Sequence, residues 1–224
     1  MKNVMKTFDA YAEQYDSWFD SPEGKALFDI EVNAIKTLMK DIHRPFLEIG
    51  VGTGRFAEKL GIGFGVDPSP AALSFALKRG IITRKAEGEK LPYQDKSFGA
   101  VFLLFTLCFV KDVSKVLSEA KRVLKEDGRL IIGIINRDSV LGRLYMKKKA
   151  EGHPIYKHAH FYRVNELAKL IVKAGMTAEA YSSALCRTFP ARPFKEDVHS
   201  CIIKKAGFVC VRSRKIDRGE KNGG

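Results

Sequence analysis

FLEIGVGTGRF (Phe46–Phe56) is the stretch that decides how this 224-residue chain folds. It opens with an apolar run, Phe46–Ile49, which predicts a buried strand. Three glycines then follow at alternate positions: Gly50, Gly52 and Gly54. Glycine permits a positive φ and carries no Cβ, so a turn of this kind lets a ligand approach the backbone closely. We therefore expect a strand, a ligand-binding turn and a short helix, in that order.

Strand and helix patterns alternate along the rest of the chain. Apolar runs predict four further strands, at residues 62–67, 81–86, 97–105 and 129–135. Strands that are apolar along their length are covered on both faces, as in a parallel sheet. Two more strand patterns, at 177–185 and 207–215, fit an antiparallel pair at the sheet edge. The expected fold is α/β: a doubly wound, mostly parallel seven-stranded sheet with helices on both faces, an antiparallel strand at the edge and an N-terminal helical cap.

The chain has the length of a single α/β domain. We expect residues 1–44 to form the helical cap and residues 45–216 to form the domain itself. A substrate-side insertion at about 136–162 shows no clean period, and residues 217–224 read as a mobile tail.

Composition narrows the class of protein. The N-terminus lacks an apolar leader, and the longest apolar run, Ala100–Val110, is too short to span a bilayer, so we expect a soluble, cytoplasmic protein. Its oligomeric state cannot be read from the sequence. No pair of cysteines has the C-x-x-C spacing, which favours buried, reduced thiols and no metal site. The four cysteines are Cys108, Cys186, Cys201 and Cys210.

The net charge of +13 is concentrated in the second part of the chain. From Arg143 to the end, 18 Lys and Arg stand against 7 Asp and Glu. This asymmetry fits a solvated basic surface, a pocket for an anionic acceptor, or an RNA-binding face. The basic residues lack an interleaved aromatic platform, which favours an anionic small molecule over RNA. The residues expected at such a pocket are Arg137, Arg143, Lys147, Lys148 and Lys149.

The glycine pattern excludes two common phosphate-binding turns. A dinucleotide site needs G-x-G-x-x-G, and Arg55 stands where the third glycine would be. A P-loop needs G-x-x-x-x-G-K-[ST], which is absent. The pattern is instead E-x-G-x-G-x-G, from Glu48 to Gly54.

Four segments in order resemble the S-adenosylmethionine-dependent methyltransferases of the seven-stranded class, in the small-molecule branch that includes ubiquinone and menaquinone methyltransferases. They are LEIGVGTGRF (47–56), GVDPSP (65–70), AEGEKLPYQDKSFGAVFLLFTLCFVKD (86–112) and VLSEAKRVLKEDGRLIIGIINRDS (116–139). The resemblance is strong from Phe46 to Asn136 and weaker in FDAYAEQYDSWF (8–19) and HFYRVNELAKLIVKAGM (160–176). It implies S-adenosylmethionine as the cofactor and transfer of a methyl group to a small-molecule acceptor.

The resemblance also implies the cofactor site. Glu48 would lie near the cationic methionine end, Asp67 would accept from the ribose hydroxyls, and Glu87 with Gly88 would meet the adenine. Asp67 could instead cap a turn, and Glu87 could belong to a charged loop. Tyr15, like Tyr11 on the same helix, could cover the cofactor or pack in the core. The full cofactor set expected is Tyr11, Glu48, Gly50, Gly52, Asp67, Pro68, Glu87, Gly88 and Leu107.

The acceptor side is less defined. Candidates for a general base lie in the 136–162 segment: His153, His158, His160 and Tyr156. Two positions depart from the family pattern, because Gly99 replaces a common acidic residue and Cys108-Phe109 replaces a usual histidine pair. The alternatives are a non-catalytic cofactor-binding or RNA-binding protein of the same fold, and an NAD(P)-dependent oxidoreductase.

Overall fold

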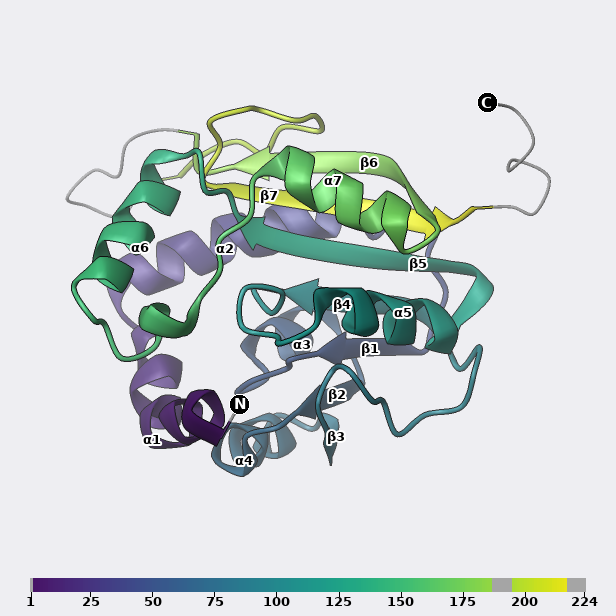
Figure 1. Cartoon of the computed structure of the whole chain (residues 1–224), viewed down its shortest axis with the longest axis horizontal. Coiled ribbons are helices and arrows are strands. Elements are labelled where there is room, and N and C mark those ends of the chain that lie inside the picture. The colour runs from purple at the N-terminus through teal and green to yellow at the C-terminus, as the bar shows by residue number, and fades with distance from the viewer. Residues whose placement is uncertain (1, 187–194, 217–224) are drawn as a thin grey trace.

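The strands form one seven-stranded sheet in the order β3-β2-β1-β4-β5-β7-β6. The computed structural model describes residues 2–186 and 195–216, and Figure 1 shows their arrangement. Strands β1 to β5 pair in parallel, and β7 runs antiparallel to both β5 and β6. The predicted fold class is confirmed, and the antiparallel strand lies one place in from the edge strand β6. The strands are β1 (Phe46–Ile49), β2 (Phe64–Asp67), β3 (Ile82–Lys85), β4 (Phe98–Leu104), β5 (Leu124–Ile135), β6 (Met176–Ala184) and β7 (Phe208–Lys215).

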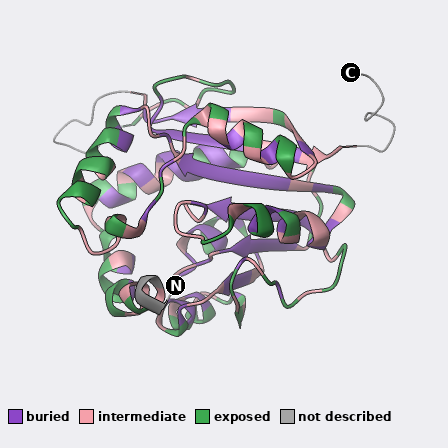
Figure 2. Ribbon diagram, in the orientation of Figure 1, coloured by how far each residue is buried: buried purple, intermediate pink, exposed green. Residues whose placement is uncertain are grey.

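Helices cover both faces of the sheet, and Figure 2 shows the central strands buried beneath them. One apolar cluster joins α2 (Pro22–Thr37), α3 (Arg55–Leu60) and α4 (Pro70–Lys78) to one face. A second cluster joins α5 (Val113–Val123) and α7 (Val164–Lys173) to the other face. Strand β4 is buried at every position, as its continuous apolar sequence predicts.

Two helices lie at one end of the sheet, α1 (Lys2–Trp18) and α6 (Val140–Ala150), on the left of Figure 1. A short 3-10 turn, η1 (Tyr156–His158), follows α6, so the stretch without a clear sequence period is partly helical. Of the two N-terminal helices, α2 packs on the sheet, where Ser182 Oγ of β6 donates to the backbone oxygen of Ala34 at 2.8 Å. The end of the sheet is therefore left to α1 and α6.

No helix in the described part of the chain combines the length and apolar character needed to cross a membrane. Residues 217–224, expected to form a tail, lie outside the described residues.

Candidate functional site

A cavity of about 620 Å³ lies at the carboxyl ends of the parallel strands, between α1 and α6. Its wall includes the last residues of strands from both halves of the sheet, such as Asp67 of β2 and Ile135 of β5. This is the edge at which open α/β sheets bind ligands. Eight of the nine residues expected at the cofactor line this cavity: Tyr11, Gly50, Gly52, Asp67, Pro68, Glu87, Gly88 and Leu107.

The glycine turn after β1 uses its glycines for different reasons. Gly50 has φ +74°, and a Cβ added there would lie 2.4 Å from the side chain of Thr106. Gly52 has φ +52°, and a Cβ added there would meet no atom within 4 Å. Gly50 is thus required by backbone conformation and by packing inside the protein. Gly52 is the position where the absence of a side chain leaves room for a ligand.

The carboxylate of Asp67 holds the glycine turn in place. One oxygen accepts from the backbone N–H of Gly52 at 2.9 Å, and the other accepts from that of Ser69 at 2.9 Å. Asp67 therefore caps the turn before α4, one of the two roles the sequence allows. Each carboxylate oxygen can accept a further bond, so the same group can also receive hydroxyl donors from the cavity. Burial raises the pKa of Asp67 to about 6, although the two backbone bonds oppose the shift.

Glu48 lies beneath the turn and is only 2% exposed. Its Oε2 atom is fully buried and has no hydrogen-bond partner among the described residues. Burial, together with the nearby charge of Asp67, raises the pKa of Glu48 well above its ordinary value. A buried carboxyl without a partner is costly, and an ammonium group would satisfy it. Glu48 is the one expected cofactor residue that does not line the cavity, so its contact with the cationic methionine end of S-adenosylmethionine stays a prediction of the sequence resemblance.

Helix α1 is fastened over the cavity by polar contacts with two other helices. Asp9 accepts from Ser69 Oγ at 2.5 Å, at the N-terminus of α4. Arg55 of α3 pairs with Asp16 at 2.9 Å and with Asp20 at 2.6 Å. The arginine that occupies the place of a dinucleotide-site glycine is therefore used to dock α1.

The other end of the cavity is aromatic and contains a buried acid. Glu31 of α2 lines the cavity, is 7% exposed, and receives no hydrogen bond from the described residues. Burial raises its pKa to about 8. Three tyrosines share this end: Tyr15, Tyr145 and Tyr156. Burial raises the pKa of each, and the rings of Tyr145 and Tyr156 lie 4.5 Å apart between centroids.

Of the basic residues expected at an acceptor pocket, the cavity wall includes Lys148. Successive helical residues point about 100° apart, so α6 turns Lys148 inward and its two neighbours away. Arg137 instead pairs with Glu166 at 2.7 Å, and Arg143 donates to the backbone oxygen of Asp138 at 2.9 Å. Arg137, Arg143, Lys147 and Lys149 do not line this cavity, and Arg137 and Lys149 line a separate hollow instead.

The histidines predicted as bases do not gather in one place. His153 lines the cavity, with its ring centroid 4.6 Å from that of Tyr156. Burial and the charge of Lys148 lower the pKa of His153. His160 lines a separate hollow on the outside of α6 with Arg137, and His158 lines neither.

The charges around the cavity oppose the charge of the whole chain. Five carboxylic acids and two lysines line it, although the net charge of the protein is +13. The acids are Glu23, Glu31, Asp67, Glu87 and Glu89, and the lysines are Lys111 and Lys148. The raised pKa of Glu31 leaves that acid mostly neutral at pH 7, so four acids and two lysines set the charge, and this balance favours cationic ligands over anionic ones.

The two departures from the family pattern have structural consequences. A Cβ added at Gly99 would lie 1.7 Å from the backbone oxygen of His43, so no side chain fits there. Cys108 lines the cavity, and burial raises the pKa of its thiol to about 12. A thiol with that pKa stays protonated at neutral pH and is a poor nucleophile.

The contributors to the cavity that the sequence analysis missed include Glu31, Tyr145 and Phe161. Glu31 carried a usable signal, because it lies four residues after Leu27 and three before Ala34, on the apolar face of its helix. An acid on that face has to be buried. Tyr145 and Phe161 carried no such signal, because the sequence of their segment has no clear helical or strand periodicity.

Comparisons with known proteins show which family the chain resembles. A family model described as a methyltransferase domain matches residues 47–132. An uncharacterized protein from Methanocaldococcus jannaschii is 43% identical over 221 residues, covering 95% of this chain and 100% of that one. The ubiquinone/menaquinone biosynthesis C-methyltransferase UbiE of Bartonella bacilliformis is 33% identical over 130 residues, covering 58% of this chain and 45% of that one.

A solved structure matches along nearly the whole chain. It is a Thermotoga maritima protein described as a SAM-dependent methyltransferase, possible histamine N-methyltransferase. The TM-score is 0.87 at 36% sequence identity, with 95% of this chain and 100% of that chain covered.

Proposed function

This chain belongs to the family of S-adenosylmethionine-dependent methyltransferases, and we propose that it methylates a small amine held at the Glu31 end of its cavity. The observation that carries the proposal is that one cavity joins Gly52 and Asp67 to Glu31 and the surrounding tyrosines. Cofactor and acceptor can then meet inside a single enclosed space, with α1 and α6 limiting access of water.

Residues of the glycine-turn end hold the cofactor in this proposal. Asp67 receives the ribose hydroxyls, Glu87 receives the adenine amino group, and the absence of a side chain at Gly52 leaves room for the methionine portion. Glu48 does not line the cavity, so its buried, unpartnered Oε2 would meet the ammonium of the methionine portion only if the glycine turn moves on binding. S-adenosylmethionine supplies a methyl group on a sulfonium, which is already a good leaving group, so the protein mainly has to position the acceptor.

In this proposal Glu31 is the general base that removes a proton from the acceptor. An amine is mostly an ammonium ion at neutral pH, and it must lose a proton before its nitrogen can attack a methyl group. Burial raises the pKa of Glu31 to about 8, so the ionised form that accepts this proton is a minority at pH 7 and predominates above pH 8. The nitrogen lone pair is then free, while the carboxyl becomes neutral in a buried place that favours the neutral form. The rings of Tyr145 and Tyr156 already hold a cation, because the Nζ of Lys148 lies 5.4 and 6.0 Å from their centroids.

The proposal differs from the anionic acceptor that the basic second half of the chain suggests. Only Lys148 of the basic cluster lines the cavity, and its Nζ lies 5.4 Å from the centroid of the Tyr145 ring. The name of the Thermotoga maritima neighbour, which mentions histamine, supports an amine for the present chain.

The test uses three acceptors of the same shape: an arylethylamine, the corresponding alcohol and the corresponding carboxylic acid. We expect methyl transfer to the amine, and we expect Glu31→Gln to abolish it while binding S-adenosylhomocysteine like the parent protein. Methylation of the alcohol or acid in place of the amine would refute the proposed acceptor. So would a Glu31→Gln variant as active as the parent protein.

A further inference from the structure

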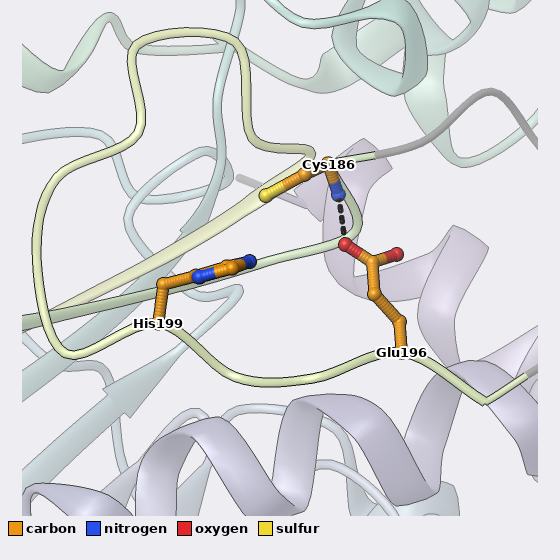
Figure 3. A group of neighbouring side chains, drawn as sticks. All are labelled: Cys186, Glu196 and His199. Carbon is orange, nitrogen blue, oxygen red and sulfur yellow. Dashed lines mark hydrogen bonds between the residues drawn. The ribbon is translucent and has the colours of Figure 1, made fainter.

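Three side chains that could bind a metal meet outside the cavity, beyond the end of β6. They are Cys186, Glu196 and His199, and Figure 3 shows them pointing toward one another. One potential ligand atom from each lies within 4.8 Å of the other two. We propose that this group is a binding site for a zinc-class divalent cation. The inference is independent of the acceptor proposed above.

Backbone pairing brings the three residues together. His199 forms two backbone hydrogen bonds with Ser183 of β6, at 2.8 and 2.9 Å. The hydroxyl of Ser183 accepts from the backbone N–H of Ile203 at 3.0 Å and donates to the oxygen of Cys201 at 2.7 Å. These bonds fix the segment that carries His199 beside Ser183. Ser183 lies three residues before Cys186, so His199 and Cys186 come close together.

The carboxylate of Glu196 is half satisfied. One oxygen accepts from the backbone N–H of Cys186 at 2.5 Å, which orients the carboxylate toward the group. The other, Oε2, is buried and has no hydrogen-bond partner among the described residues. In Figure 3 this second oxygen points away from Cys186 and His199, so the oxygen that faces the group is the one bonded to Cys186.

The donor set selects the kind of cation. A thiolate, an imidazole and a carboxylate together suit zinc, whereas magnesium and calcium prefer oxygen ligands alone. Bond lengths of about 2.0–2.3 Å place neighbouring ligand atoms on tetrahedral zinc about 3.3–3.8 Å apart. The side chains therefore need to close by about 1 Å from the 4.8 Å limit. Water would complete the four-coordinate shell.

A cation that binds this group has to displace the proton of the Cys186 thiol. Burial, followed by the charge of Glu196, raises the pKa of Cys186 to about 11. A bound divalent cation reverses this, because a coordinating thiol loses its proton. Thiolate and carboxylate then together balance the two positive charges.

Such a cation would connect the end of β6 to the segment that leads into β7. Leu185, next to Cys186, lies beside Gly207, and Leu141 of α6 lies beside the same glycine. Leu141 also lines the cavity. The cation would thus steady the base of α6 without touching the reacting groups.

The experiment measures zinc content in the full-length protein. Protein treated with EDTA, desalted and kept under a phosphine reductant is titrated with zinc chloride, passed through a desalting column and assayed by mass spectrometry. We expect one zinc per chain, an increase in Tm, and a thiolate-to-cobalt absorption band when Co²⁺ replaces zinc. Cys186→Ser and His199→Ala should each weaken zinc binding at least tenfold.

The controls keep the outcome interpretable. Cys201→Ser and His43→Ala change the same residue types outside the group and should retain zinc. Glu196→Gln keeps an oxygen for the bond from Cys186 and removes the charge, so it tests the site if a cysteine variant does not fold. Failure of the parent protein to retain zinc at micromolar concentration would overturn the proposal. Zinc binding unchanged in both Cys186→Ser and His199→Ala would overturn it too.

Discussion

Replacing Gly52 with alanine should separate the cost of a strained backbone from the cost of a blocked cofactor site. Gly52 has φ +52°, and an added Cβ meets no protein atom within 4 Å. The stability cost is therefore conformational, and placing a non-glycine residue in this region costs about 1–2 kcal/mol. For a chain of this length, that corresponds to a decrease in Tm of about 2–8 °C.

The same methyl group would project into the cavity that Gly52 lines. Forcing one extra methyl group into a packed interface costs about 1–3 kcal/mol. At about 1.4 kcal/mol per tenfold change, the Kd for S-adenosylhomocysteine should rise about 5- to 150-fold. Isothermal titration calorimetry measures this directly.

Gly80 offers a matched control. It has φ +79°, an added Cβ there also meets nothing within 4 Å, and it does not line the cavity. Gly80→Ala should lower Tm by a similar amount and leave the affinity for S-adenosylhomocysteine unchanged. Equal affinity in both variants and the parent protein would refute the placement of the cofactor against Gly52.

Three further outcomes follow from the site and the sheet. Burial raises the pKa of Asp67 to about 6, so the affinity for S-adenosylhomocysteine should fall as the pH drops through 6. The variant Asp67→Asn should bind S-adenosylhomocysteine weakly at every pH. An affinity of the parent protein that does not change with pH would contradict the role of the carboxylate. The raised pKa of Glu31 stabilises the folded state below the ordinary pKa of the group, and this stabilisation is lost as the pH rises through about 8. Thermal unfolding from pH 6 to 9 should therefore show a steeper loss of Tm in the ligand-free parent protein than in Glu31→Gln, and parallel curves would count against burial of the acid. Gly99→Ala should destabilise the fold by about 1–3 kcal/mol or more, because the added Cβ would lie 1.7 Å from the backbone oxygen of His43. Gly63→Ala should not destabilise the fold, because a Cβ added there meets nothing within 4 Å. Urea unfolding of the two variants measures the difference in stability.

Much of the fold could be predicted because its signals are local. The burial of β4 on both faces is written in a continuous apolar run, and the start of α4 in Ser69 followed by Pro70. The turn after β1 could be read from Gly50 and Gly52, because positive φ is a property of single residues. Eight of the nine expected cofactor residues line one cavity. Most of them follow parallel strands, and the carboxyl ends of parallel strands share one edge of the sheet.

By itself, the sequence determined the alternation of strands and helices, the sheet edge that carries the ligands, and the family resemblance that implies the cofactor. Only the tertiary structure decided which lysine of Lys147–Lys149 faces inward, because that depends on how α6 docks. It also decided that Glu31 of α2 meets the tyrosines of α1, α6 and η1, and that Cys186 meets His199 beyond the sheet. These contacts join residues far apart in the chain, and the packing of whole elements sets them, so no local pattern of residues records them.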